Sequence, residues 1–293
     1  NHIGIPLTIL ETPDDVEIAI IEMGANHQKE IESYCEYALP THGIITNIGK
    51  AHLEGFGGIV GVQKGKRELY DFLFKNKGII FCNISQAFME EWGALFSPIE
   101  YSHQDYRTED IGEGMVIECL KDGRTFKSQL TGTYNINNIA AALAIGKYFG
   151  ISDDAAVQAI AAYQPENMRS QWQRTEKNEL IIDAYNANPT SLENALRNLS
   201  NSKEVSTLAI VGEMREMGEF SHLEHEKLVD LIEHLSLDCV LVGKEFKELK
   251  RDYLWFENVD DLIHHITKCP ISGKRILIKG SRGIQLEKVL PYL

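Results

Sequence analysis

The chain has 293 residues, of which 43% are hydrophobic and 25% charged, and its formal net charge is −14. This composition is typical of a folded protein with a sizeable core, and the length allows two domains. The acidic balance argues against a general nucleic-acid binder. No apolar run is long enough to span a bilayer and no signal peptide is visible, so we expect a cytoplasmic protein without stable membrane insertion. The five scattered cysteines are expected to be reduced.

The first part of the chain alternates strand-like and helix-like patterns. Apolar runs of strand length alternate with segments of helical spacing, which is typical of βαβ units and a parallel sheet. The expected strands are Val16–Met23, Gly43–Ile48 and Gly78–Cys82, and the expected helices between them are Gln28–Ala38 and Gly58–Phe74.

The middle of the chain changes character before the βαβ rhythm returns. A hairpin that turns at Lys121–Gly123 predicts a small antiparallel element, and two helices, Asn135–Phe149 and Asp153–Tyr163, follow it. Helical periodicity stops at Tyr163 and Pro165 breaks the chain, so we place a domain boundary here, between residues 1–166 and 167–293. The strands expected beyond it are Leu180–Ala184, Thr207–Gly212, Cys239–Gly243 and Arg275–Lys279, which predict a Rossmann-like doubly wound domain.

Two polar stretches follow the first two expected strands. "EMGANH" places Glu22 at one strand end, and "NIGKAHLEG" places His52 shortly after the next. Ligands of open α/β sheets sit beyond the carboxyl ends of the strands, so the two side chains could share one cation. A carboxylate and an imidazole suit Mg²⁺ or Mn²⁺ bound to phosphate oxygens. The alternative is that Glu22 caps the next helix and His52 is an ordinary loop residue.

The helix "GVQKGKRELY" carries two lysines beside its apolar stripe. Lys64 and Lys66 are two positions apart and point in different directions, so one is expected to reach water while the other could face the site. A lysine ammonium cannot bind a cation. Carbamylation by CO₂ would turn the amine into an anionic ligand, although the spacing alone does not indicate it.

Further polar residues follow strands or open helices later in the chain. Asn135 and Asn138 lie on the first turn of a small-residue helix, which suits a nucleotide contact, although capping would explain one of them equally well. In the second domain, "DAYNANPTS" carries Asp183 and Asn186, and "GEMREMG" and "KGSRG" follow later strands. Because all three turns come after strands of one sheet, we expect them to gather at one edge as a binding face.

In these motifs the chain resembles the Mur ligase family, which builds the peptide stem of bacterial cell-wall precursors. The stretches "EMGANHQKEI", "TNIGKAHLEGFG", "KGKRELY", "DAYNANPTS", "GEMREMGEFS" and "KGSR" match in order and spacing. They resemble above all the member that adds D-alanyl-D-alanine. The resemblance covers essentially the whole chain and implies a central P-loop-type ATPase domain followed by a Rossmann-like C-terminal domain.

The resemblance also implies roles for particular residues. Glu22 and His52 fall on the family's magnesium positions, and Lys66 falls on its carbamylated lysine, which leaves Lys64 as a bystander. These three residues would form the catalytic and metal site. The residues that would bind the nucleotide or lie on the closing face are Asn135, Asn138, Arg169, Asp183, Asn186, Lys279, Ser281 and Arg282.

The implied activity is an ATP- and Mg²⁺-dependent ligase. It would join D-alanyl-D-alanine to UDP-N-acetylmuramoyl-tripeptide through an acyl phosphate, as a monomer. Another ligase of the superfamily, such as a folylpolyglutamate-type enzyme, and a non-catalytic nucleotide-binding remnant are the alternatives.

The sequence departs from the family pattern in two places. The junction reads "ENMRSQ" where the family has a Pro-Gly-Arg type sequence, which weakens the match of Arg169. The phosphate-binding G-x-x-G-K-[ST] pattern is absent from these 293 residues. We therefore expect an N-terminally truncated fragment that is inactive alone.

Overall fold

The structure, a computed structural model, describes residues 1–166, 168–202 and 205–293, and it divides into two compact units. Unit one is Asn1–His103 and unit two is Gln104–Leu293. The boundary expected after residue 166 stays a prediction, and Asn167, the first residue beyond it, lies outside the described residues. No helix of the described residues is both long and apolar enough to cross a bilayer.

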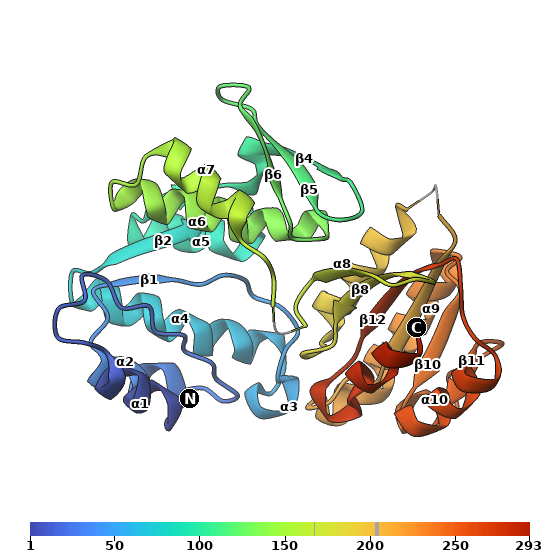
Figure 1. Cartoon of the computed structure of the whole chain (residues 1–293). Coiled ribbons are helices and arrows are strands. Elements are labelled where there is room, and N and C mark those ends of the chain that lie inside the picture. Colours follow the sequence, from blue (N-terminus) through green and yellow to red (C-terminus); the bar gives the residue numbers. More distant parts are fainter. Residues whose placement is uncertain (167, 203–204) are drawn as a thin grey trace. The chain divides into compact units, whose positions relative to one another are not determined.

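Unit one is built around a short parallel sheet with the strand order β1-β2-β3. Helix α4 packs against this sheet, and α2 packs against α4 on the side away from the strands (Figure 1). The elements are α1 (Gly4–Glu11), α2 (Glu30–Ala38), β1 (His42–Ile44), α3 (Leu53–Phe56), α4 (Ile59–Lys75), β2 (Ile79–Asn83), α5 (Ala87–Phe96) and β3 (Ile99–Tyr101).

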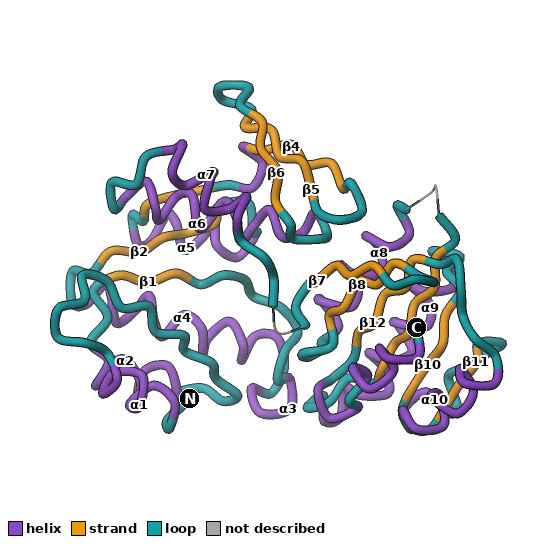
Figure 2. The backbone as a smooth tube through the Cα atoms, in the orientation of Figure 1, coloured by secondary structure: helices purple, strands orange, loops and turns teal. Residues whose placement is uncertain are grey.

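The expected strand at Val16–Met23 is wrong. This segment runs between α1 and α2 as loop, without a partner strand among the described residues (Figure 2). Several of its apolar side chains stay outside the core, since Ile18 is 49% exposed and Ile20 90%, whereas Ile21 and Met23 pack at the edge of the cluster around α2. An apolar run predicts a strand only where a neighbouring strand accepts its backbone hydrogen bonds, and β1 pairs only with β2 in the described part of the chain.

Strand β1 is also shorter than expected, because a tyrosine side chain from α4 accepts a backbone hydrogen bond that a neighbouring strand would otherwise accept. The hydroxyl of Tyr70 accepts the N–H of Ile45 at 3.2 Å and donates to the carbonyl of Phe81 at 2.6 Å. Tyr70 is fully buried and contacts the rings of Trp92 and Phe96 edge-on. One side chain thus connects α4 to the end of β1 and to the middle of β2.

Two glycines let helix α3 approach helix α4 closely. A Cβ atom on Gly61 would collide with the backbone of Phe56, and one on Gly65 would collide with the Phe56 ring. Both glycines are buried. These glycines are therefore needed for packing, because they let Phe56 of α3 lie directly against the α4 backbone.

Unit two contains an antiparallel meander and a larger sheet. The expected hairpin is confirmed, since β5 (Met115–Cys119) and β6 (Thr125–Ser128) pair antiparallel, with β4 (Tyr106–Asp110) beside β5. The two expected helices are also confirmed, as α6 (Ile136–Tyr148) and α7 (Asp153–Ala162). They pack on the meander through Met115, Ile117, Ile136 and Ile139.

The larger sheet of unit two has the strand order β11-β10-β9-β12-β8-β7, parallel except for the edge strand β7. Helix α10 and the 3₁₀ helix Leu286–Tyr292 pack on one face through a shared apolar cluster. The helix that follows the last strand is 3₁₀ and contains Pro291. The elements are β7 (Gln171–Arg174), β8 (Glu179–Asp183), α8 (Pro189–Ser200), β9 (Thr207–Gly212), α9 (Ser221–His234), β10 (Cys239–Val242), β11 (Leu254–Phe256), α10 (Val259–Lys268) and β12 (Arg275–Lys279).

A buried ion pair fixes the register of β8 and β12. Lys279 and Asp183 are directly opposite one another in the ladder, and Lys279 Nζ lies 2.6 Å from Asp183 Oδ2. The side chains are only 2% and 14% exposed. An ammonium group at this depth requires a carboxylate partner, so the pair is fixed in place.

We expect Tyr70→Phe to lower the free energy of unfolding of unit one by about 1–3 kcal/mol, because it leaves the buried Ile45 N–H and Phe81 carbonyl without their partner. Tyr37→Phe is the matched control in the same unit, since Tyr37 is 41% exposed. Urea unfolding measures both. A Tyr70→Phe protein as stable as the control would contradict the bridging role.

We expect Lys279→Met to lower stability by about 3–5 kcal/mol, because it leaves the Asp183 carboxylate buried without a counter-charge. Lys274→Met is the control at the other end of the same strand. Lys274 pairs with Asp238 at 2.9 Å, but that carboxylate is 69% exposed, so its loss should cost less than about 1 kcal/mol. Equal losses of unfolding free energy in the two variants, measured by urea unfolding, would contradict the larger cost expected for the buried pair.

Candidate functional site

The loops that carry Glu22 and His52 are pressed together in unit one. Glu22 is exposed in the loop before α2, and His52 precedes α3 in a left-handed conformation, with φ of 53°. A Cβ atom on Gly55 would collide with the carbonyl oxygen of Asn26 and lie 3.1 Å from His27 Nε2. A glycine at position 55 therefore permits the contact between the two loops.

Helix α4 presents its two lysines very differently. Lys64 is exposed, whereas Lys66 is partly buried and its Nζ donates a hydrogen bond to the carbonyl of Asn47 at 2.7 Å. Burial lowers the pKa of Lys66 below its usual value of 10.5. The neutral amine is the form that reacts with CO₂, so the environment of Lys66 fits the expected modification. The choice of Lys66 over Lys64 agrees with this geometry and stays a prediction.

The proposed ligands of unit one could bind Mg²⁺ only if Lys66 were modified to carry oxygen ligands. Among the residues that the structure describes, no group of three His, Cys, Asp or Glu side chains could hold a metal ion. Glu22 and His52 offer a carboxylate and an imidazole, and a carbamate on Lys66 would add anionic oxygens of the kind that Mg²⁺ prefers. The expected metal site therefore depends on Lys66 and remains untested.

In unit two, a chain of hydrogen bonds connects the two predicted asparagines to the buried ion pair. Asn138 Nδ2 donates to Asn135 Oδ1 at 2.9 Å, and Asn135 Nδ2 donates to Ser170 Oγ at 3.2 Å. The backbone N–H of Ser170 then donates to Asp183 Oδ1 at 3.3 Å. The other carboxylate oxygen accepts from Lys279. These residues, distant in sequence, thus form one polar cluster.

The capping alternative for the asparagines is wrong where it can be checked. Asn135 stands at the N-cap position of α6 but makes no side-chain cap hydrogen bond. Its amide group instead donates to the Thr131 carbonyl at 2.8 Å and to Ser170. Asn135 is buried, and its side chain holds the turn before α6 rather than the helix end.

The three polar turns of the second half meet at the carboxyl edge of the larger sheet, as expected. Lys279 Nζ also donates to the Asn186 carbonyl at 3.2 Å, which joins the turns after β12 and β8. The hydroxyl of Ser281 accepts the N–H of Arg215 at 2.9 Å and so adds the turn after β9. The clustering of the turns is confirmed, whereas their ligand is not tested by this geometry.

Two arginines lie over one tyrosine ring at this edge. The guanidinium carbon of Arg169 is 3.9 Å from the centre of the Tyr185 ring, and that of Arg282 is 5.4 Å from it. Stacking on the ring leaves the N–H edges of a guanidinium group free for anions. Both arginines are exposed, so this part of unit two offers positive charge to solvent beside the Lys279–Asp183 pair.

Sequence reasoning missed residues that hold this arrangement together. Ser170 is buried and contacts Asn135, Tyr134 and Asp183, yet it reads as an unremarkable serine after the domain boundary. Tyr185 lies within "DAYNANPTS", where the sequence pattern indicates no role for it. The position of Ser170 beside Arg169, at the expected junction, was the available signal.

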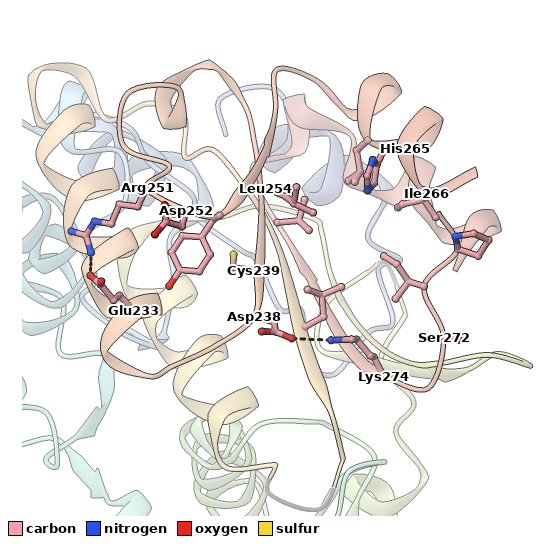
Figure 3. A pocket seen from close by; sticks show the side chains of 16 residues that line it. Glu233, Asp238, Cys239, Arg251, Asp252, Leu254, His265, Ile266, Ser272 and Lys274 are labelled. Carbon is pink, nitrogen blue, oxygen red and sulfur yellow. Dashed lines mark hydrogen bonds and ion pairs between the residues drawn. The ribbon is translucent and has the colours of Figure 1, made fainter. Parts of the chain in front are cut away.

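A pocket of about 730 Å³ lies elsewhere in unit two. It opens at the amino ends of β9, β10 and β11 and contains none of the predicted site residues (Figure 3). Two ion pairs line it, Arg251 with Glu233 and Lys274 with Asp238. The pocket therefore lies at the edge of the sheet opposite to the polar cluster.

Comparison with known families covers almost the whole chain. Residues 1–146 match the Mur ligase middle domain, and residues 168–282 match the Mur ligase glutamate ligase domain. Among curated proteins, the UDP-N-acetylmuramoyl-tripeptide–D-alanyl-D-alanine ligase of Bacillus subtilis is 30% identical over 310 residues, which cover 100% of this chain and 68% of that protein. The Escherichia coli protein of the same name is 30% identical over 313 residues, covering 100% and 69%.

Solved structures agree with this match. MurF from Acinetobacter baumannii superposes with a TM-score of 0.85 and 27% identity, covering 98% of this chain and 67% of that one. MurF from Thermotoga maritima, crystallised with ADP, gives a TM-score of 0.87 over 99% and 70% of the two chains, and at 23% identity it supports the fold alone. The α/β architecture expected from the sequence is thereby confirmed, and the chain belongs to the Mur ligase family, with relatives of the MurF type.

Proposed function

We propose that this chain carries out ATP-dependent amide bond formation, adding D-alanyl-D-alanine to UDP-N-acetylmuramoyl-tripeptide in peptidoglycan precursor synthesis. The observation that carries the proposal is the end-to-end match, at 30% identity, to curated ligases of that name. Both proposed substrates and ATP are cytoplasmic small molecules, so the reaction would take place in the cytoplasm.

The proposed reaction has two steps. The terminal carboxylate of the tripeptide attacks the γ-phosphorus of ATP, the bond to the bridging oxygen breaks, and ADP leaves with the electron pair. The amine of D-alanyl-D-alanine then attacks the acyl carbon of the resulting acyl phosphate and loses a proton, and inorganic phosphate leaves. Positioning and charge neutralisation are the protein's main tasks in phosphoryl transfer.

We assign nucleotide binding to the polar cluster of unit two. Its preformed hydrogen bonds support this assignment, because a site whose side chains are already held in place loses less entropy on binding. The cationic groups near the cluster suit phosphate oxygens. The residues assigned are Asn135, Asn138, Arg169, Asp183, Asn186, Lys279, Ser281 and Arg282.

We assign the cation-binding role to unit one, through a carbamate on Lys66. The neutral amine attacks the carbon of CO₂, a nitrogen–carbon bond forms, one C=O bond pair becomes the carboxylate charge, and the nitrogen releases a proton to water. The lowered pKa of Lys66 supports this chemistry. Mg²⁺ held by the carbamate, Glu22 and His52 would neutralise charge on the transferred phosphoryl group.

We expect Lys66→Ala to lower ligase turnover by at least about 100-fold in the protein that carries this chain, because it removes an anionic group that organises charge at the phosphoryl group. Added formate or acetate should restore part of the activity by standing in for the carbamate. Lys64→Ala is the matched control, since Lys64 is exposed on the same helix, and it should stay within about twofold of wild type.

Phosphate release that depends on both proposed substrates measures these activities. A wild-type protein that turns over ATP with neither substrate would contradict the proposed function. An inactive Lys64→Ala protein beside an active Lys66→Ala protein would leave the function standing and refute the site.

Uptake of CO₂ by Lys66 should rise with pH and reach its half-maximum at a lower pH than uptake by an ordinary exposed lysine side chain at the same dissolved CO₂. Only the neutral amine reacts, and burial of Lys66 lowers its pKa, so neutral amine accumulates at a lower pH than for an ordinary lysine. The ¹³C resonance of the carbamate formed from ¹³CO₂, at fixed dissolved CO₂, measures this uptake. Lys66→Ala should lack the resonance, and a half-maximum no lower than that of a free lysine side chain at the same dissolved CO₂ would contradict the assignment.

A further inference from the structure

Helix α2 begins without a capping side chain of its own. Its N-cap residue is Lys29, which has a left-handed φ of 74° and makes no side-chain cap hydrogen bond. A lysine side chain can only donate, so it cannot satisfy the free N–H groups at a helix start. The nearby Glu30 side chain turns back instead, and its Oε2 accepts the N–H groups of Asn26 at 2.6 Å and His27 at 3.0 Å.

Glu68 on helix α4 supplies the missing cap. Its Oε1 accepts the N–H of Lys29 at 2.6 Å, and its Oε2 accepts the N–H of Glu32 at 3.0 Å. These are the N-cap and N3 amides, the same two that a capping box satisfies with side chains of its own helix. Here one carboxylate from a distant helix satisfies both, so the start of α2 is tied to α4.

The same helix also holds the loop beyond β1. Two residues before Glu68, Lys66 donates from its Nζ to the carbonyl of Asn47. Side chains two positions apart point to quite different sides of a helix, so α4 contacts one loop on each side. The two loops are the one that follows Glu22 and the one that leads to His52.

We propose that Glu68 is a positioning residue for the cation site assigned to unit one. It fixes the loop after Glu22 relative to Lys66, through the amide groups at the start of α2. The close contact of Gly55 with Asn26 connects the same loop to the one that carries His52. The three proposed ligands would thus be held by one helix and one loop contact. This inference rests on the proposed function of that site.

The test compares Glu68→Ala and Glu68→Gln with Glu36→Ala, all in the protein that carries this chain. Glu36 is an exposed acidic residue on α2, so its loss removes the same charge without touching the cap. Amide hydrogen exchange of the first turn of α2, without ligand, should be about fivefold faster in Glu68→Ala than in wild type. The exchange rate of Glu68→Gln should lie between those of wild type and Glu68→Ala, because the one carbonyl oxygen of glutamine can keep one of the hydrogen bonds.

The second readout is the Mg²⁺ concentration that gives half-maximal turnover. It should rise about tenfold in Glu68→Ala, with turnover at saturating Mg²⁺ close to wild type, because the ligands are present but no longer held. Glu36→Ala should match wild type in both readouts. If Glu68→Ala fails to fold, Glu68→Gln decides, with smaller changes in the same directions.

Two results would overturn the proposal. Unchanged hydrogen exchange in the Glu68 variants would show that the carboxylate does not cap α2 in solution. Faster exchange with an unchanged Mg²⁺ requirement would leave Glu68 as a structural cap with no positioning role. The exchange measurement needs no substrate, so failure of the cap is distinguishable from failure of the proposed ligase activity.

Discussion

The ion pair between Lys279 and Asp183 is the constraint on which the polar edge of unit two depends. The two residues end adjacent parallel strands in register, and Lys279 is almost completely buried. Because a charge at this depth must be compensated, the turns beyond both strands have to keep their polar groups at this edge. The Asn186 carbonyl accepts a second hydrogen bond from Lys279, and the Ser170 N–H donates to Asp183, which extends the cluster to the turn before α6.

Most elements of the fold follow from the periodicity of the sequence. The four strands expected in the second half all form, because each is an apolar run with strand neighbours that pair with it. The strand at Val16–Met23 has the same kind of apolar run and does not form, since pairing depends on a partner that local sequence does not specify. The early end of β1 has a similar cause, because the Ile45 N–H donates its hydrogen bond to a side chain 25 residues away.

Parts of the candidate site could be predicted from the position of a residue within its own strand or helix. Polar residues just beyond strand ends indicated the edge of the sheet, and two lysines on one helix indicated that one of them would be buried. Glu68 could not be found in this way, because its carboxylate accepts backbone N–H groups 39 and 36 residues away in the chain. Ser170 bonds to the side chains of Asn135, 35 residues before it, and Asp183, 13 residues after it, and its place at the expected junction is the local signal that it offers. Long-range capping leaves no spacing pattern in the sequence, and only the fold reveals it.

The buried glycines of α4 have a consequence for how order arises around Lys66. Each glycine in a helix interior costs about 1 kcal/mol relative to alanine, so Gly61 and Gly65 make α4 a poor helix by itself. The helix is therefore stabilised mainly by the residues packed on it, Phe56 among them. Chain segments that meet around Lys66 must then become ordered together, and a ligand bound there would raise the melting temperature of the surrounding helices as one cooperative block.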